Sequence, residues 1–192
     1  MSERINIEQV NHLSNEEFVA RFGSLYEHSP WVAEAAYNAR PFGSLEELHG
    51  AMVRAVDAAP EGRKMDLILS HPELAGEAAA EGTLTPESTR EQTSAGLDGL
   101  TPEEYEAFHR LNAAYKEKFG FPLIFAVREH TKEMLLSSAE ARLENPREEE
   151  IETALSEIAK IAHLRLQELI EPQPGPRVGY PTREETREGG RA

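Results

Sequence analysis

Residues 146–170 read PREEEIETALSEIAKIAHLRLQELI, and this stretch decides the fold class. Its apolar side chains recur every three or four residues, which is the spacing of one face of an α-helix. The apolar stripe consists of Ile151, Leu155, Ile158, Ala162 and Leu169. This pattern predicts a long helix that packs against other elements, because a single helix cannot bury its own apolar face.

The chain before this stretch has the same helical character. Capping boxes, in which a hydroxyl group and a glutamate three residues later both bond to the backbone, predict helix starts. They are Ser14 with Glu17, Ser44 with Glu47, and Thr101 with Glu104. A capping side chain before a proline predicts further starts. These are Ser29-Pro30, Thr85-Pro86 and Asn145-Pro146. Because no sustained apolar–polar alternation indicates strands, we predict an all-α, single-domain bundle of roughly eight or nine helices.

Residues 119–127, FGFPLIFAV, depart from this pattern. The segment is apolar on all sides and is interrupted by Gly120 and Pro122. Pro122 disfavours helical backbone at Phe121, so the segment is either a short buried strand or an irregular buried connector. Buried backbone outside regular structure needs hydrogen-bond partners, which the protein itself or a polar ligand could supply.

The last 22 residues, Glu171–Ala192, form a separate segment of the sequence. They hold four of the 12 prolines and four of the 13 glycines, and they contain no apolar stripe. We therefore predict a helical domain over residues 1–170 and a flexible tail over residues 171–192.

Charge and composition exclude several classes of function. The net charge is -15, so the protein repels phosphate backbones, and nucleic acid is not an expected partner. Without cysteine there is no disulfide, thiolate metal site or cysteine nucleophile, and no histidine pair with helical spacing indicates a zinc site. No apolar leader or membrane-spanning run is present, so we expect a cytoplasmic protein that does not bind membranes.

His71 is the first candidate for chemistry. It follows an apolar run, residues 65–69, that is typical of a helix end, and Pro72 disfavours helical backbone at His71. A histidine at such a break can project into a cleft and transfer protons near neutral pH. The alternative is that its ring only hydrogen bonds a carbonyl group at the helix end.

Ser88, Glu91 and Gln92 form the second candidate. Their spacing in the helix predicted after Thr85-Pro86 places them on one face, which Ala95 continues. Such a face either lines a polar pocket or is simply solvated.

Arg165 is the third candidate, because it falls on the apolar stripe of the long helix. A guanidinium group facing the core must meet an anion or extend to solvent, and Leu164 and Leu166 widen the apolar surface around it. Arg165 therefore either pairs with a buried Glu or Asp or binds an anionic ligand.

These residues lie within segments that resemble the OHCU decarboxylases of urate degradation, which act on 2-oxo-4-hydroxy-4-carboxy-5-ureidoimidazoline (OHCU). The matching segments follow one another in order and cover roughly residues 5–170. They are YEHSPW (26–31), RPF (40–42), HPELAG (71–76), GTLTPESTREQTSAGLDGL (82–100), LNAAYKEKFGFP (111–122), AVR (126–128) and RL (165–166). The sequence departs slightly at Leu123, where the family often has phenylalanine.

The resemblance implies an all-α, usually dimeric carboxy-lyase that converts OHCU to (S)-allantoin and carbon dioxide without metal or organic cofactor. His71 matches the catalytic histidine, and Arg165 matches an arginine of the same pocket. We expect Glu91 to act with them, either by orienting His71 or by holding the ureido group. The other expected substrate contacts are Pro72, Ser88, Gln92 and the backbone of Leu123, Ile124, Phe125, Ala126 and Val127.

Two alternatives to this function remain open. A helical scaffold without catalytic activity could retain the fold, although it would tolerate the loss of His71, Glu91 or Arg165, and all three are present. A decarboxylase of a related ureido-imidazoline is the other alternative, because Leu123 could alter the pocket.

Overall fold

The computed structural model describes residues 4–172. This part of the chain contains ten α-helices, a single 3-10 turn called η1, and no strand. Their bounds are α1 Ile7–His12, α2 Asn15–Phe22, α3 Trp31–Tyr37, α4 Leu45–Asp57, α5 Glu61–Leu69, α6 Glu77–Ala80, α7 Pro86–Ser94, α8 Pro102–Phe119, η1 Val127–Glu129, α9 Lys132–Arg142 and α10 Arg147–Leu169. Only α6 is as short as four residues. Because all the named elements of the described part are helical, the all-α prediction is confirmed there.

Most of the predicted helix starts are confirmed. Ser14 and Thr101 form full capping boxes, and the Thr85 hydroxyl accepts from the Ser88 N–H group ahead of α7. Ser44 also caps α4, but the Glu47 carboxylate accepts from the Gly43 N–H group at 2.7 Å instead of bonding to Ser44.

Two predicted caps are wrong. Neither Ser29 nor Asn145 caps a helix, because α3 and α10 each begin one residue after the proline and have no side-chain cap. The Asn145 amide instead donates to Glu150 at 2.8 Å. For Asn145 the reason is that the contact with a buried carboxylate outweighs a cap, which contributes only about 1 kcal/mol.

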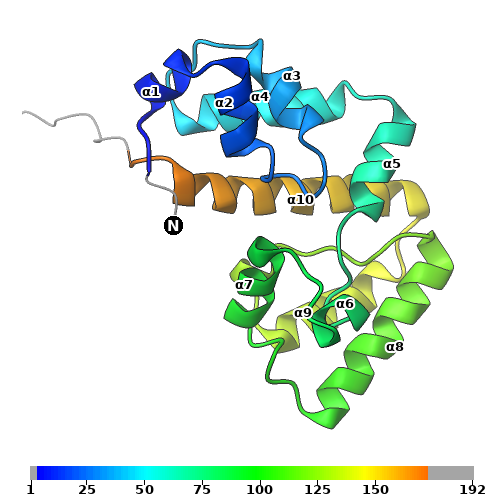
Figure 1. The fold of residues 1–192 in the computed structure, drawn as a ribbon. Coiled ribbons are helices and arrows are strands. Elements are labelled where there is room, and N and C mark those ends of the chain that lie inside the picture. Colours follow the sequence, from blue (N-terminus) through cyan, green and yellow to red (C-terminus); the bar gives the residue numbers. More distant parts are fainter. Residues whose placement is uncertain (1–3, 173–192) are drawn as a thin grey trace, which may run out of the picture.

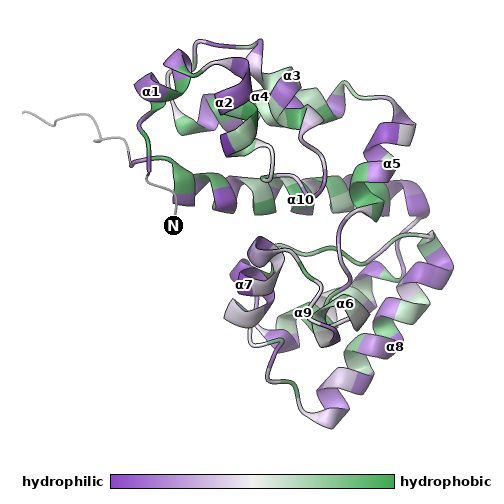
Figure 2. Cartoon of the chain, viewed as in Figure 1, coloured by the Kyte–Doolittle hydropathy of each residue, from purple (hydrophilic) through white to green (hydrophobic). Residues whose placement is uncertain are grey.

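The long helix α10 is the central element (Figure 1), with α1–α4 on one side and α6–α9 on the other. It packs against α4 and α5, α3 packs between α2 and α4, and α8 packs against α9. Hydrophobic and hydrophilic bands alternate along α10 (Figure 2), as expected for a helix with one buried face. A single core cluster extends from Val10 to Ile170 and includes large side chains from both sides of α10, such as Phe22, Met52 and Phe108.

The two ends of the described chain are joined at the end of α10. The Ile5 N–H group donates to the Leu169 carbonyl at 3.0 Å, and the Glu171 N–H group donates to the Ile5 carbonyl at 2.8 Å. The predicted flexible tail lies outside the described residues from residue 173 onwards. The division into a domain over residues 1–170 and a tail stays a prediction.

The apolar segment after α8 is a buried connector, and the alternative of a short strand is wrong. Gly120 has φ +81°, a left-handed conformation that ends α8. All side chains from Phe121 to Val127 are buried, and the backbone there is irregular until η1 begins. The segment therefore brings non-helical backbone into the interior.

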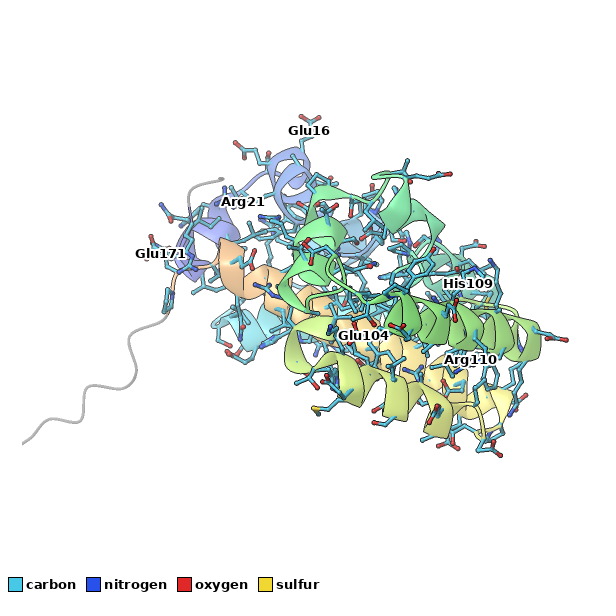
Figure 3. The ribbon with its side chains drawn as sticks, turned by 90° about the horizontal axis from the view of Figure 1, so that it is seen from below. Glu16, Arg21, Glu104, His109, Arg110 and Glu171 are labelled. Atoms are coloured by element: carbon cyan, nitrogen blue, oxygen red, sulfur yellow. The ribbon has the colours of Figure 1, made fainter. Side chains whose placement is uncertain are left out.

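Charged side chains project outward from the ribbon (Figure 3), and the labelled Glu16 and Glu171 are both exposed. In residues 4–172, no helix has both the length and the apolar character that crossing a membrane requires.

Candidate active site

Most of the predicted site residues line one small pocket of about 30 Å³. Its walls come from the loop after α5, from α7, from the buried connector and from α10. Of the eleven residues predicted for the site, only Leu123 and Ala126 are not among its lining residues. Leu74 and Ile161, which the sequence did not indicate, complete the wall. Ser88, Glu91 and Gln92 thus lie in a pocket wall, and their contact with a substrate stays a prediction.

His71 lies at the break between α5 and α6, as predicted, and is 7% exposed. Its Nδ1 atom lies 2.9 Å from the Leu67 carbonyl oxygen. Because a carbonyl only accepts, Nδ1 must carry the hydrogen, which leaves a lone pair on Nε2. The structure thus combines both interpretations of His71: one nitrogen bonds a helix-end carbonyl, while the ring lines the pocket.

Burial lowers the pKa of His71 to about 4, although the Leu67 carbonyl and the charge of Glu27 act in the opposite direction. The ring is therefore neutral near pH 7 and can accept a proton on Nε2.

Arg165 is buried, as its place on the stripe predicts, and it pairs with two carboxylates. Its Nε and Nη2 atoms donate to the two oxygens of Glu91 at 2.7 and 2.8 Å, and its Nη1 atom donates to Glu27 at 3.0 Å. Burial disfavours the charge, but the hydrogen bonds and charges of Glu91 and Glu27 outweigh it and raise the pKa of Arg165. The two alternatives for Arg165 were a buried ion pair and the binding of an anionic ligand. The described structure shows the ion pair, and Arg165 also lines the pocket.

Glu27 is the residue of this cluster that sequence reasoning missed. It is 3% exposed and accepts from the Thr85 hydroxyl at 2.6 Å as well as from Arg165. Burial raises its pKa, but these donors and the Arg165 charge more than compensate, so the pKa is lowered and the carboxylate is ionised. The place of Arg165 on the core stripe indicated that such a residue exists, because a buried guanidinium group needs an anionic partner.

Gln92 holds the loop that carries His71. Its amide oxygen accepts from the Ala75 N–H group at 3.0 Å, and its amide nitrogen donates to the Glu73 carbonyl at 3.3 Å. Asn112 donates to the Leu74 carbonyl of the same loop at 2.7 Å. These bonds hold Ala75 at φ +48°, a left-handed conformation that a residue with a side chain rarely adopts.

The expectation that Glu91 orients His71 is wrong for the described structure. Both Glu91 oxygens bond to Arg165, and the Leu67 carbonyl orients the His71 ring instead. The physical reason is that a bidentate pair between a guanidinium and a carboxylate is a strong, geometrically matched interaction.

A second, larger cavity of about 250 Å³ adjoins the pocket. The two cavities share Glu91 and Arg165, so this ion pair forms the boundary between them. Three more arginines line the larger cavity, and they are Arg21, Arg90 and Arg128. We call this space the outer cavity. In the part of the chain that the structure describes, no group of three or more imidazole and carboxylate side chains is arranged to hold a metal ion.

Comparison with known proteins connects the chain with one family. A sequence model of that family, OHCU decarboxylase, matches residues 11–167. The 2-oxo-4-hydroxy-4-carboxy-5-ureidoimidazoline decarboxylase of Haloferax volcanii is 44% identical over 164 residues, which cover 85% of this chain and 95% of that protein. The protein of the same name from Halalkalicoccus jeotgali is 41% identical over 172 residues, covering 90% and 96%. The crystal structure of (S)-allantoin synthase superposes with a TM-score of 0.71 at 29% identity, covering 86% of this chain and 54% of that one.

Proposed function

The chain belongs to the OHCU decarboxylase family and is a carboxy-lyase of urate degradation, and we propose that it forms (S)-allantoin and carbon dioxide in the pocket around His71. The observation that carries this assignment is the neutral His71 ring in a pocket whose wall also bears the Arg165 charge. The pair offers a proton acceptor and a cation to an anionic substrate.

The substrate supplies its own electron sink. When carbon dioxide leaves, the electron pair of the broken C–C bond stays on the ring carbon that carried the carboxylate. It delocalises into the adjacent C=N bond, whose nitrogen takes a proton from solvent. The hydroxyl group on the same carbon becomes the carbonyl of allantoin as its proton leaves, and the neighbouring carbon, which bears the ureido group, receives a proton.

His71 fits this proton transfer. Nε2 accepts the hydroxyl proton and returns it to the carbon that bears the ureido group, while Nδ1 remains bonded to the Leu67 carbonyl. The nearby Glu27 charge favours the transient imidazolium. Delivery from one fixed side of the substrate gives a single stereoisomer. The (S) configuration of that isomer is what the family resemblance implies.

Substrate binding requires the pocket to enlarge. A volume of about 30 Å³ has room for only about two or three water molecules, whereas the substrate is a ring with carboxyl, hydroxyl and ureido groups. The substrate carboxylate takes the place of Glu91 on Arg165, and the released Glu91 accepts from the ureido N–H groups. This exchange joins the pocket to the outer cavity, because the Glu91–Arg165 pair separates them.

The test is to add the protein to freshly generated OHCU and to follow the handedness of allantoin by circular dichroism. We expect rapid formation of the (S) isomer, compared with slow racemic decay in buffer. Decay at the buffer rate in the presence of folded protein would support the scaffold alternative and exclude the proposed enzyme.

The alternative of a related ureido-imidazoline substrate receives no support at Leu123. The Leu123 side chain is 1% exposed and is not among the residues that line the pocket. The substitution of leucine for phenylalanine therefore changes core packing behind the connector and leaves OHCU as the favoured substrate.

We also propose that the chain is a homodimer, as the family resemblance implies, and that it works in the cytoplasm. Exposed apolar side chains such as Leu69 and Met134, about half accessible in the single chain, offer area for such contacts. Light scattering coupled to size-exclusion chromatography tests this, and a mass near 21.4 kDa would contradict the dimer.

A further inference from the structure

The buried connector carries a row of backbone N–H groups at the pocket. The N–H groups of Leu123, Ile124 and Phe125 have no hydrogen-bond acceptor among the residues that the structure describes, whereas the Ala126 N–H group donates to Glu157 at 2.7 Å. Ile124 and Phe125 line the pocket. Buried N–H groups without an acceptor are costly, so a ligand in the pocket gains from bonding to them.

An arginine outside the pocket holds the peptide group to which the Phe125 N–H belongs. Arg142, the last residue of α9, donates from Nη1 to the Ile124 carbonyl at 2.8 Å. Because the Ile124–Phe125 peptide is trans, its C=O and N–H groups point in opposite directions. The bond to Arg142 therefore turns the Phe125 N–H group away from Arg142.

Arg142 is itself fixed by a buried network. Its Nε atom donates to Glu150 at 2.9 Å, and its Nη2 atom lies 2.8 Å from the same carboxylate oxygen and donates to the Tyr115 hydroxyl oxygen at 3.1 Å. Glu150 is fully buried and also accepts from Tyr115 and from Asn145. The guanidinium group lies over the Phe125 ring, 4.7 Å from its centroid, so Arg142 holds both the backbone and the side chain of this part of the connector.

We infer that Arg142 is a positioning residue for decarboxylation: it fixes the Ile124–Phe125 peptide so that the Phe125 N–H group donates to the substrate ring. The inference rests on the proposed function, since it concerns the same pocket. The electron pair released by decarboxylation spreads over the ring, and a donor fixed there stabilises that charge without reorganising. Glu157 anchors the next N–H group, at Ala126, and so limits the rotation of the peptide that follows.

The chain offers a matched control. Arg147 donates from Nε to the Phe119 carbonyl at 3.1 Å, at the start of the same connector, and its guanidinium lies over the Phe121 ring at 5.7 Å. Neither Phe119 nor Phe121 lines the pocket. Arg147→Lys therefore removes a similar arginine from the connector without releasing the Ile124 carbonyl.

We expect Arg142→Lys to lower kcat by about 10- to 100-fold with little change in KM, and Arg147→Lys to leave both within about two-fold. Unchanged kcat in folded Arg142→Lys, or an equal loss in Arg147→Lys, would overturn the inference. If Arg142→Lys does not fold, the double substitution Arg142→Met with Glu150→Gln avoids a stranded buried charge and should fold with the same loss of kcat.

A binding measurement is independent of turnover. In 15N-labelled wild-type protein, saturating (S)-allantoin should shift the amide resonance of Phe125, and the shift should shrink in Arg142→Lys but persist in Arg147→Lys. A Phe125 amide that does not respond in the wild type would refute the role given to this N–H group. Wild-type protein that fails to turn over OHCU would instead count against the proposed function.

Discussion

The Nδ1 atom of His71 is occupied by the Leu67 carbonyl, so any proton transfer by the ring passes through Nε2. Asparagine has a similar polarity but no group that takes up a proton near neutral pH. His71→Asn should therefore fold and lose about 100- to 10,000-fold in kcat, measured as stereoselective allantoin formation.

The matched control is His109→Asn on the exposed side of α8, labelled in Figure 3, which should retain the wild-type rate. A folded His71→Asn protein that turns over like the control would remove His71 from the mechanism.

Arg165 has both a structural and a proposed binding role. Arg165→Ala leaves the buried Glu27 carboxylate without its cation, so we expect a loss of about 3–5 kcal/mol in the free energy of unfolding together with a loss of activity. The comparison is Arg128→Ala, which breaks the largely exposed pair with Glu168 and should cost no more than about 1 kcal/mol. Urea denaturation measures both.

The outcome for Arg165→Ala has an internal check. Adding Glu27→Gln removes the stranded charge, so the double variant should recover part of the stability but none of the activity. Recovery of activity in the double variant would mean that Arg165 serves only to neutralise Glu27.

At the scale of elements, α7 and α10 meet at the Glu91–Arg165 pair, and the outer cavity lies beside it. Four arginines and three glutamates line this cavity, so its lining carries a small net positive charge in a protein of net charge -15. Arg90→Ala should lower kcat/KM for the anionic substrate by a few-fold at low salt, and the difference should vanish at high salt.

Arg110→Ala is the control for Arg90→Ala, because it removes one exposed positive charge from α8, away from both cavities. If the two variants respond alike to salt, the effect reflects total charge and not the outer cavity.

The bond between Glu171 and Ile5, just after α10, determines how much of the C-terminal segment can be removed. Glu171 still bonds to Ile5, whereas residues 173–192 are rich in proline and glycine and have no apolar stripe. A chain ending at Pro172 should keep its turnover within a few-fold and its thermal midpoint within a few degrees. Loss of activity in a folded chain of this length would assign the tail to a site or an interface.

At the scale of the whole molecule, the buried charges make stability depend on pH. The pKa of His71 is about 4 in the native protein, against an ordinary value of 6.5, so the unfolded chain binds more protons between these values. The lowered pKa of Glu27 adds a loss below about pH 4.5, and burial of His49 acts in the same direction as that of His71. Stability should therefore fall as the pH is lowered from 7 to 4.

Urea midpoints at pH 7, 6 and 5 measure this loss for the wild type and for His71→Asn. The contribution of His71 is on the order of 3 kcal/mol at most, and the variant should show a correspondingly weaker dependence on pH. Equal slopes for the two proteins would show that His71 titrates normally.

The sequence by itself determined the features that depend on neighbouring residues. Thr85 with Pro86 starts α7, Gly120 ends α8, and the spacing of Ser88, Glu91 and Gln92 puts them on one face, because helix periodicity and capping act within a few residues. The same periodicity predicted that Arg165 would be buried.

Only the tertiary structure decided which groups pair. Glu27 pairs with Arg165, which lies 138 residues away in the sequence. Arg142 donates to the Ile124 carbonyl from α9, and Gln92 bonds to the loop that carries His71. A buried polar group bonds to whichever partner packing brings within reach, and no local pattern specifies that partner. For the same reason the Asn145 cap was predicted wrongly, since buried Glu150 had not been placed beside it.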